Sequence, residues 1–148
     1  LQDQGKLEGA EAVLREAIVE AENYWPEGDA TVGQKYGALG AFFMIVGVPS
    51  SAEPMLRQAL DIYREAYPNG AFRVSNSQVR LAECLTALGR YEEAEPFLVQ
   101  GFDWLLTDRG LEDSYTREVG EKLIELYAGL GRPNEEARYR RLLEGGGL

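Results

Sequence analysis

The stretch LGRYEEAEPFL at residues 88–98 decides the fold, because its glycine belongs to a series that recurs at a constant interval. Glycines stand at positions 5, 47, 89 and 131, so each is 42 residues from the next. A period between about 20 and 50 residues is typical of repeat proteins, in which one structural unit stacks on the next. Small and apolar residues keep the same interval, in the sets Ala10, Ala52 and Ala94; Leu14, Leu56 and Leu98; and Leu39, Leu81 and Leu123.

Within each unit the apolar residues recur every three or four positions, which is the spacing of an amphipathic helix. One such pattern precedes each repeated glycine and another follows it. Each unit is therefore predicted to be a helical hairpin that turns at its glycine, where positive φ ends the first helix. Linkers with proline or glycine separate the hairpins. We predict seven helices in a single domain: a lone second helix in a partial repeat at 1–28, then hairpins at 29–70, 71–111 and 112–148.

Local signals predict where the helix after Gly47 begins. Ser50 followed by Glu53 fits a capping box, in which the two side chains satisfy free backbone N–H groups. Pro54 would then fall in the first turn, where a proline removes no intrahelical hydrogen bond.

Residues 88–98 resemble the tetratricopeptide repeat (TPR), in the 42-residue variety found in kinesin light chains and many bacterial proteins. The segments 67–91 and 113–133 are similar to TPR segments that follow the catalytic domain of some bacterial Ser/Thr protein kinases. The resemblance covers nearly the whole chain, and it implies an all-α, right-handed solenoid of helical hairpins. Two roles stay open: a scaffold for protein–protein interaction, or a C-terminal regulatory segment of a bacterial kinase.

Composition excludes several classes of chemistry. The 148 residues include no histidine and a single cysteine, Cys84, which rules out imidazole-dependent catalysis, an intrachain disulfide and a CxxC metal site. Phosphate-binding glycine loops and calcium-binding loops are missing from the sequence. We therefore expect no catalytic activity, no metal and no cofactor.

The charge and hydropathy of the chain narrow the class of partner. A net charge of −10 disfavours nucleic acid and anionic membranes, which both attract basic surfaces. The longest apolar stretch, 37–48, is shorter than the roughly 20 residues that span a bilayer. The sequence opens with neither a signal peptide nor an initiator methionine, and its first residues resemble the end of a helix, so we expect a fragment of a longer cytoplasmic protein.

The resemblance also implies a concave groove, lined by the first helix of each hairpin. The family's groove positions are small and apolar in the N-terminal half of this chain and acidic in the C-terminal half. We therefore expect a protein or peptide partner with an apolar anchor at one end and basic residues at the other. The predicted groove residues are Gln34, Ala41, Met44, Asn76, Val79, Glu83, Glu118, Glu121 and Glu125.

The acidic residues of the predicted groove also have a purely structural interpretation. Glu118, Glu121 and Glu125 are spaced three and four residues apart, as on a solvated helix face whose charges pair with Lys122 or Arg117.

The other candidates have structural interpretations as well. Met44 and Ile45 suit packing between repeats, and so do Trp25 and Trp104, whereas Cys84 suits a buried position. The first helix has no hairpin partner, so its apolar face would favour self-association of this chain.

Overall fold

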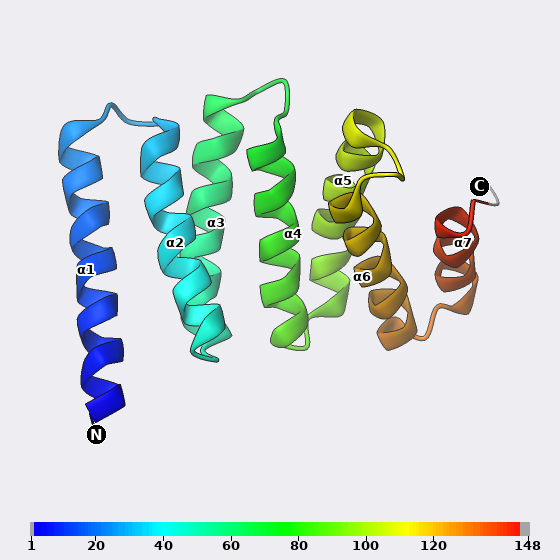
Figure 1. Cartoon of the computed structure of the whole chain (residues 1–148), viewed down its shortest axis with the longest axis horizontal. Helices are drawn as coiled ribbons and strands as arrows, with labels where there is room; N and C mark the ends of the chain where they lie inside the picture. Colours follow the sequence, from blue (N-terminus) through cyan, green and yellow to red (C-terminus); the bar gives the residue numbers. More distant parts are fainter. Residues whose placement is uncertain (1, 146–148) are drawn as a thin grey trace. The chain divides into compact units, whose positions relative to one another are not determined.

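The computed structural model describes residues 2–145, and within them it contains seven α-helices and no strand (Figure 1). This agrees with the helices predicted from the period. None of these helices is both long and apolar enough to cross a membrane. The helices are α1 (Gln2–Tyr24), α2 (Ala30–Ile45), α3 (Pro49–Ala66), α4 (Phe72–Ala87), α5 (Tyr91–Arg109), α6 (Ser114–Leu130) and α7 (Pro133–Leu143).

The chain divides into two compact units, and the division lies between Asn69 and Gly70. In unit 1, α2 packs against α3 as a hairpin and α1 packs against α2. In unit 2, α4 pairs with α5, α6 pairs with α7, and α5 packs against α6. The predicted hairpins are therefore present in both units.

Three of the four periodic glycines form the turns of the hairpins. Gly47, Gly89 and Gly131 all have positive φ, between 67° and 81°. After Gly89, the N–H of Arg90 donates to the carbonyl of Leu85 at 2.8 Å, and this bond closes α4 in a Schellman motif. The equivalent bond closes α2, where the N–H of Val48 donates to the carbonyl of Phe43, and α6, where the N–H of Arg132 donates to the carbonyl of Tyr127.

Gly5 departs from the prediction, because it lies inside α1 and not at a turn. Glycine permits positive φ but also adopts helical angles, so it takes the left-handed conformation only where the chain has to turn. Residues 2–10 of α1 are exposed, and the helix packs only in its second half, through Ile18 and Ala21.

The periodic leucines and alanines of the three hairpins are buried in the core, whereas Ala10 of α1 is exposed and Leu14 is half-buried. Leu39 in unit 1 and Leu123 in unit 2 are fully buried, as are Ala52 and Ala94. Small residues bring the two helices of a hairpin together: a Cβ on Gly40 would lie 2.6 Å from Cδ2 of Leu56 on α3. Such close contacts leave no room for larger side chains.

The predicted capping box is wrong. The helix begins at Pro49, one residue before Ser50, and no side chain caps it. Proline is favoured at the first helical position because its fixed φ suits the helix and its missing N–H is not needed there. Pro54 consequently lies inside α3 and not in its first turn.

Candidate functional site

The surface of unit 2 carries a cavity of about 300 Å³ between α4, α5 and α6, which we call the α4–α6 pocket. Two of the predicted groove residues line it, Glu83 from α4 and Glu125 from α6. Its walls are largely apolar, with Leu98 and Leu126 behind the charged rim. The full lining is Ala82, Glu83, Thr86, Tyr91, Leu98, Lys122, Glu125, Leu126 and Gly129.

Lys122 organises the charges at this rim. Its Nζ lies 2.9 Å from Oε1 of Glu83 and 3.7 Å from Oε1 of Glu118. Burial opposes the charge of the ammonium group, but the hydrogen bond and charge of Glu83, together with Glu118 and Glu125, raise the pKa of Lys122. Three carboxylates thus share one cation, and the rim remains negative.

Glu121 does not join this group. It lines a different cavity of unit 2, of about 400 Å³, together with Arg117 and Arg140. Glu125 borders both cavities. The four carboxylates predicted as one groove surface are therefore divided: Glu83 and Glu118 pair with Lys122, whereas Glu121 lines the cavity that Arg117 and Arg140 border.

Two other predicted groove residues of unit 2 are held by the protein itself. Val79 is 1% exposed, and its Cγ2 lies 2.9 Å from the position of a Cβ on Gly101. The prediction for Val79 is wrong, because this side chain fills the space between α4 and α5. Asn76 is half-buried, and its Oδ1 accepts a hydrogen bond of 2.7 Å from the hydroxyl of Tyr115.

In unit 1 the predicted groove residues lie along α2. Gln34 is exposed, and Ala41 and Met44 are half-buried. Ile45 is 84% exposed, so the packing interpretation of this residue is wrong.

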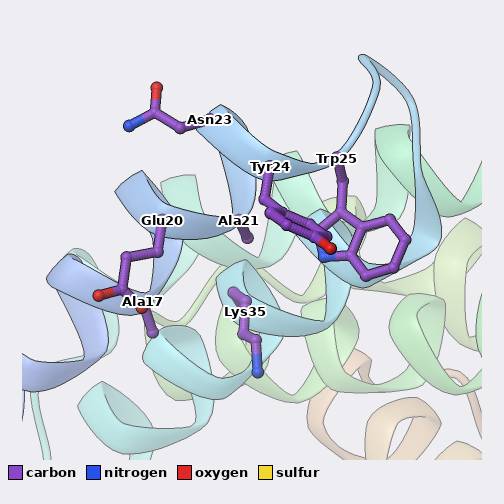
Figure 2. Close-up of a pocket in the computed structure, with 7 residues that line it drawn as sticks. All are labelled: Ala17, Glu20, Ala21, Asn23, Tyr24, Trp25 and Lys35. Carbon is purple, nitrogen blue, oxygen red and sulfur yellow. The ribbon is translucent and has the colours of Figure 1, made fainter.

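A cavity of about 560 Å³ lies at the end of α1, and sequence reasoning missed it (Figure 2). The rings of Tyr24 and Trp25 pack edge to face there, 5.1 Å apart, with Lys35 of α2 nearby. Tyr24 is 79% exposed and Trp25 is 42% exposed. Packing between repeats, the role predicted for Trp25, therefore accounts for only part of this side chain. The sequence signal that could have indicated the cavity is the pair of adjacent aromatic residues before a Pro-Glu-Gly turn. The residues that line this cavity at the end of α1 are Ala17, Glu20, Ala21, Asn23, Tyr24, Trp25 and Lys35.

Within residues 2–145, the cysteine and the carboxylates form no metal site. Cys84 is fully buried, as predicted. Among the described residues, no group of three or more Cys, Asp and Glu side chains is placed to hold a metal ion.

Solved structures supply the comparison that bears on this fold, since no protein-family model and no curated protein sequence matches the chain. BtubC (BKLC) from P. vanneervenii is similar over 98% of this chain, with a TM-score of 0.85 and 20% identity. A putative kinesin light chain from Podospora anserina, with nearly identical TPR-like repeats, is similar over 96%, with a TM-score of 0.82 and 17% identity. The fold is that of kinesin-light-chain-like TPR repeats.

These likenesses confirm the predicted all-α fold of TPR-like hairpins. At 17–20% identity they concern the fold alone. The chain spans 57% of the length of the BtubC chain and 67% of the Podospora chain.

Proposed function

We propose that this chain is a non-catalytic protein-interaction scaffold, and that its α4–α6 pocket binds a peptide segment with basic residues. The TPR-like fold supports the general role, since stacked helical hairpins present extended surfaces to protein partners. The α4–α6 pocket supports the specific one. It combines apolar walls with the carboxylates of Glu83 and Glu125, and its lysine, Lys122, also pairs with Glu118 outside the lining.

The chemistry of the pocket favours a peptide with a mixed sequence. An apolar side chain of the ligand would pack against Leu98 and Leu126, and a neighbouring lysine or arginine would face Glu125. Opposite charges accelerate the encounter and fix the orientation of the ligand more than they add to affinity. Binding should therefore weaken as salt screens these partly exposed charges.

Two charge-reversal variants test this proposal. Glu121 and Glu125 were predicted to line the same groove, but only Glu125 lines the α4–α6 pocket. The probe is a short synthetic peptide with leucines at one end and lysines at the other. We expect Glu125→Lys to weaken its binding about tenfold, since the rim loses its excess negative charge. Glu121→Lys is the matched control on the same helix and should change the affinity little, because Glu121 does not line this pocket. Equal affinities of wild type and Glu125→Lys, measured by calorimetry, would overturn the proposal.

Two further roles stay predictions. A regulatory segment of a bacterial Ser/Thr kinase rests on the sequence resemblance alone. Self-association has one structural observation behind it, because Val13 and Val19 of α1 are more than half exposed. Sedimentation at two concentrations tests it, and a Val13→Lys, Val19→Lys double variant should then be monomeric at both.

A further inference from the structure

Unit 1 holds a second cavity, which shares Trp25 with the one in Figure 2 and contains none of the predicted groove residues. It has a volume of about 420 Å³, within the range of ligand-binding pockets, and lies where α1 ends, α2 begins and α3 ends. We call it the α1–α3 pocket. It is lined by Glu22, Trp25, Pro26, Glu27, Gly28, Val32, Tyr36, Gln58, Asp61, Ile62 and Glu65.

The floor and walls of this pocket are apolar and aromatic. Val32 and Ile62 are buried together with Ala21, and Tyr36 packs against this cluster. Trp25 forms a further wall and remains 42% exposed. A side chain that enters the pocket therefore meets two aromatic rings and an aliphatic base.

The charges around the pocket have one sign. Four carboxylates line it, those of Glu22, Glu27, Asp61 and Glu65, and no lysine or arginine does. The nearby Lys35 lines the neighbouring cavity instead. The hydroxyl of Tyr36 donates a hydrogen bond to Oε1 of Glu22, which holds that carboxylate in place.

The 42-residue period provides an internal comparison. Trp104 stands where Ile62 stands one repeat earlier, and Gly70 corresponds to Gly28. In unit 2, Nε1 of Trp104 lies 3.1 Å from the position of a Cβ on Gly70, so the indole reaches the turn. At Gly28 the nearest atoms belong to the carboxylate of Glu65. The smaller isoleucine leaves unit 1 open at a place where unit 2 carries an indole.

We propose that the α1–α3 pocket binds an arginine side chain presented by a partner polypeptide. The aliphatic part of an arginine would pack on Val32 and Ile62, and its planar guanidinium would stack on Trp25. The same group can pair with two carboxylates at once, for which Asp61 and Glu65 on α3 are available. A lysine ammonium matches this arrangement less well, because it neither stacks nor pairs bidentately.

The proposal rests on the interaction role of the chain but not on the α4–α6 pocket. The two pockets lie in different units and share no residue. Each can therefore fail without the other.

Binding can be followed at the pocket itself, because the protein has two tryptophans and one of them lines it. The probe is a short capped peptide with one arginine between glycines, added to the ¹⁵N-labelled chain. We expect the indole N–H resonance of Trp25 to move with saturation and that of Trp104 to stay. The same peptide with citrulline, which keeps the shape but not the charge, should bind at least about tenfold more weakly. No movement of the Trp25 resonance, or equal binding of the citrulline or lysine peptide, would overturn the proposal.

Variants of the lining provide the second test. Ile62→Trp places in unit 1 the residue that unit 2 carries, and should abolish the response of Trp25 to the arginine peptide. An Asp61→Asn, Glu65→Gln double variant changes only exposed side chains, so it keeps the fold, and should weaken binding about tenfold. Asp103→Asn, one repeat after Asp61, is the matched control and should leave binding unchanged, as should Glu125→Lys. Unaltered binding to the double variant would contradict the proposal even if Ile62→Trp fails to fold.

Discussion

At the scale of single residues, the glycines inside helices differ sharply in what surrounds them. Gly101 of α5 faces α4, where an added methyl group would lie 2.9 Å from Cγ2 of Val79 and 3.1 Å from the backbone oxygen of Ser75. Gly9 of α1 has no atom within 4 Å of the same position. Replacement by alanine therefore tests side-chain packing at Gly101 and helix propensity at Gly9.

We expect Gly101→Ala to lower the free energy of unfolding by about 1–3 kcal/mol, because overpacking outweighs the better helix propensity of alanine. Gly9→Ala should raise it by up to about 1 kcal/mol. Chemical denaturation of both variants measures the difference. A Gly101→Ala variant as stable as the wild type would show that α4 and α5 are packed less tightly than described.

Tyr115 gives a pH-dependent prediction at the same scale. Burial, followed by the charge of Glu83, raises the pKa of its hydroxyl to about 12, above the ordinary 10.0. The folded state holds this proton more tightly than the unfolded chain does. The stabilisation is therefore complete below pH 10 and is lost as the pH rises towards 12.

Tyr115→Phe should make this loss shallower, although the pKa values of Tyr36 and Tyr127 are raised too, and at neutral pH it should cost about 1 kcal/mol through the hydrogen bond to Asn76. Thermal unfolding between about pH 8 and pH 11 checks both effects. If the variant loses stability at alkaline pH as steeply as the wild type, another group is responsible.

At the scale of elements, α6 depends on a cap that sequence reasoning did not identify. Oδ2 of Asp113 accepts hydrogen bonds from the N–H of Thr116, at 2.9 Å, and from its hydroxyl, at 3.1 Å. The backbone bond is the main reason why the pKa of Asp113 lies below its ordinary value of 3.8. Its stabilisation is therefore present above that pH and is lost as the pH falls below it.

We expect Asp113→Ala to lower the melting temperature at neutral pH by a few degrees. Asp113→Asn retains an oxygen that accepts the same bonds, so it should retain most of the stability and lose the acid dependence of the cap. Glu112→Ala, at an exposed neighbour, is the control. Equal melting temperatures for Asp113→Ala and Glu112→Ala would contradict the capping role.

At the scale of the whole molecule, each unit has a core of its own. Leu39 is fully buried in unit 1 and Leu123 in unit 2, and the two correspond through the repeat period. In repeat proteins, stability is a sum of local contributions from each unit and its neighbours. A core mutation that creates a cavity in one unit should therefore destabilise that unit more than the other.

We expect Leu123→Ala to cost about 2–5 kcal/mol and to accelerate amide hydrogen exchange in α4–α7 more than in α2 and α3. Leu39→Ala should accelerate amide hydrogen exchange in α2 and α3 more than in α4–α7. Equal acceleration throughout the chain in both variants would show that the molecule unfolds as one cooperative block.

The interval of 42 residues was sufficient to predict the hairpins, because each helix needs an apolar stripe and each turn needs a residue that accepts positive φ. Both requirements are local and leave a mark in the sequence. The errors concern what a local signal cannot show. Gly5 has the spacing of a turn but lies inside α1, and Ser50 and Glu53 have the pattern of a cap that Pro49 replaces.

The candidate sites depended on the tertiary structure to a much greater degree. Val79 and Glu121 occupy positions that a groove would use, yet one fills the core and the other borders a separate cavity beside two arginines. Periodicity assigns a residue to a helix face, but burial depends on the side chains of neighbouring helices.

The all-α repeat fold, its hairpins and most of its core follow from the spacing of residues along the chain. Which carboxylates share Lys122, and which line a pocket with Trp25, depends on how the helices pack. The reason is physical. Electrostatic and cavity geometry arise between side chains from different helices, and their distances are fixed only when the helices have packed.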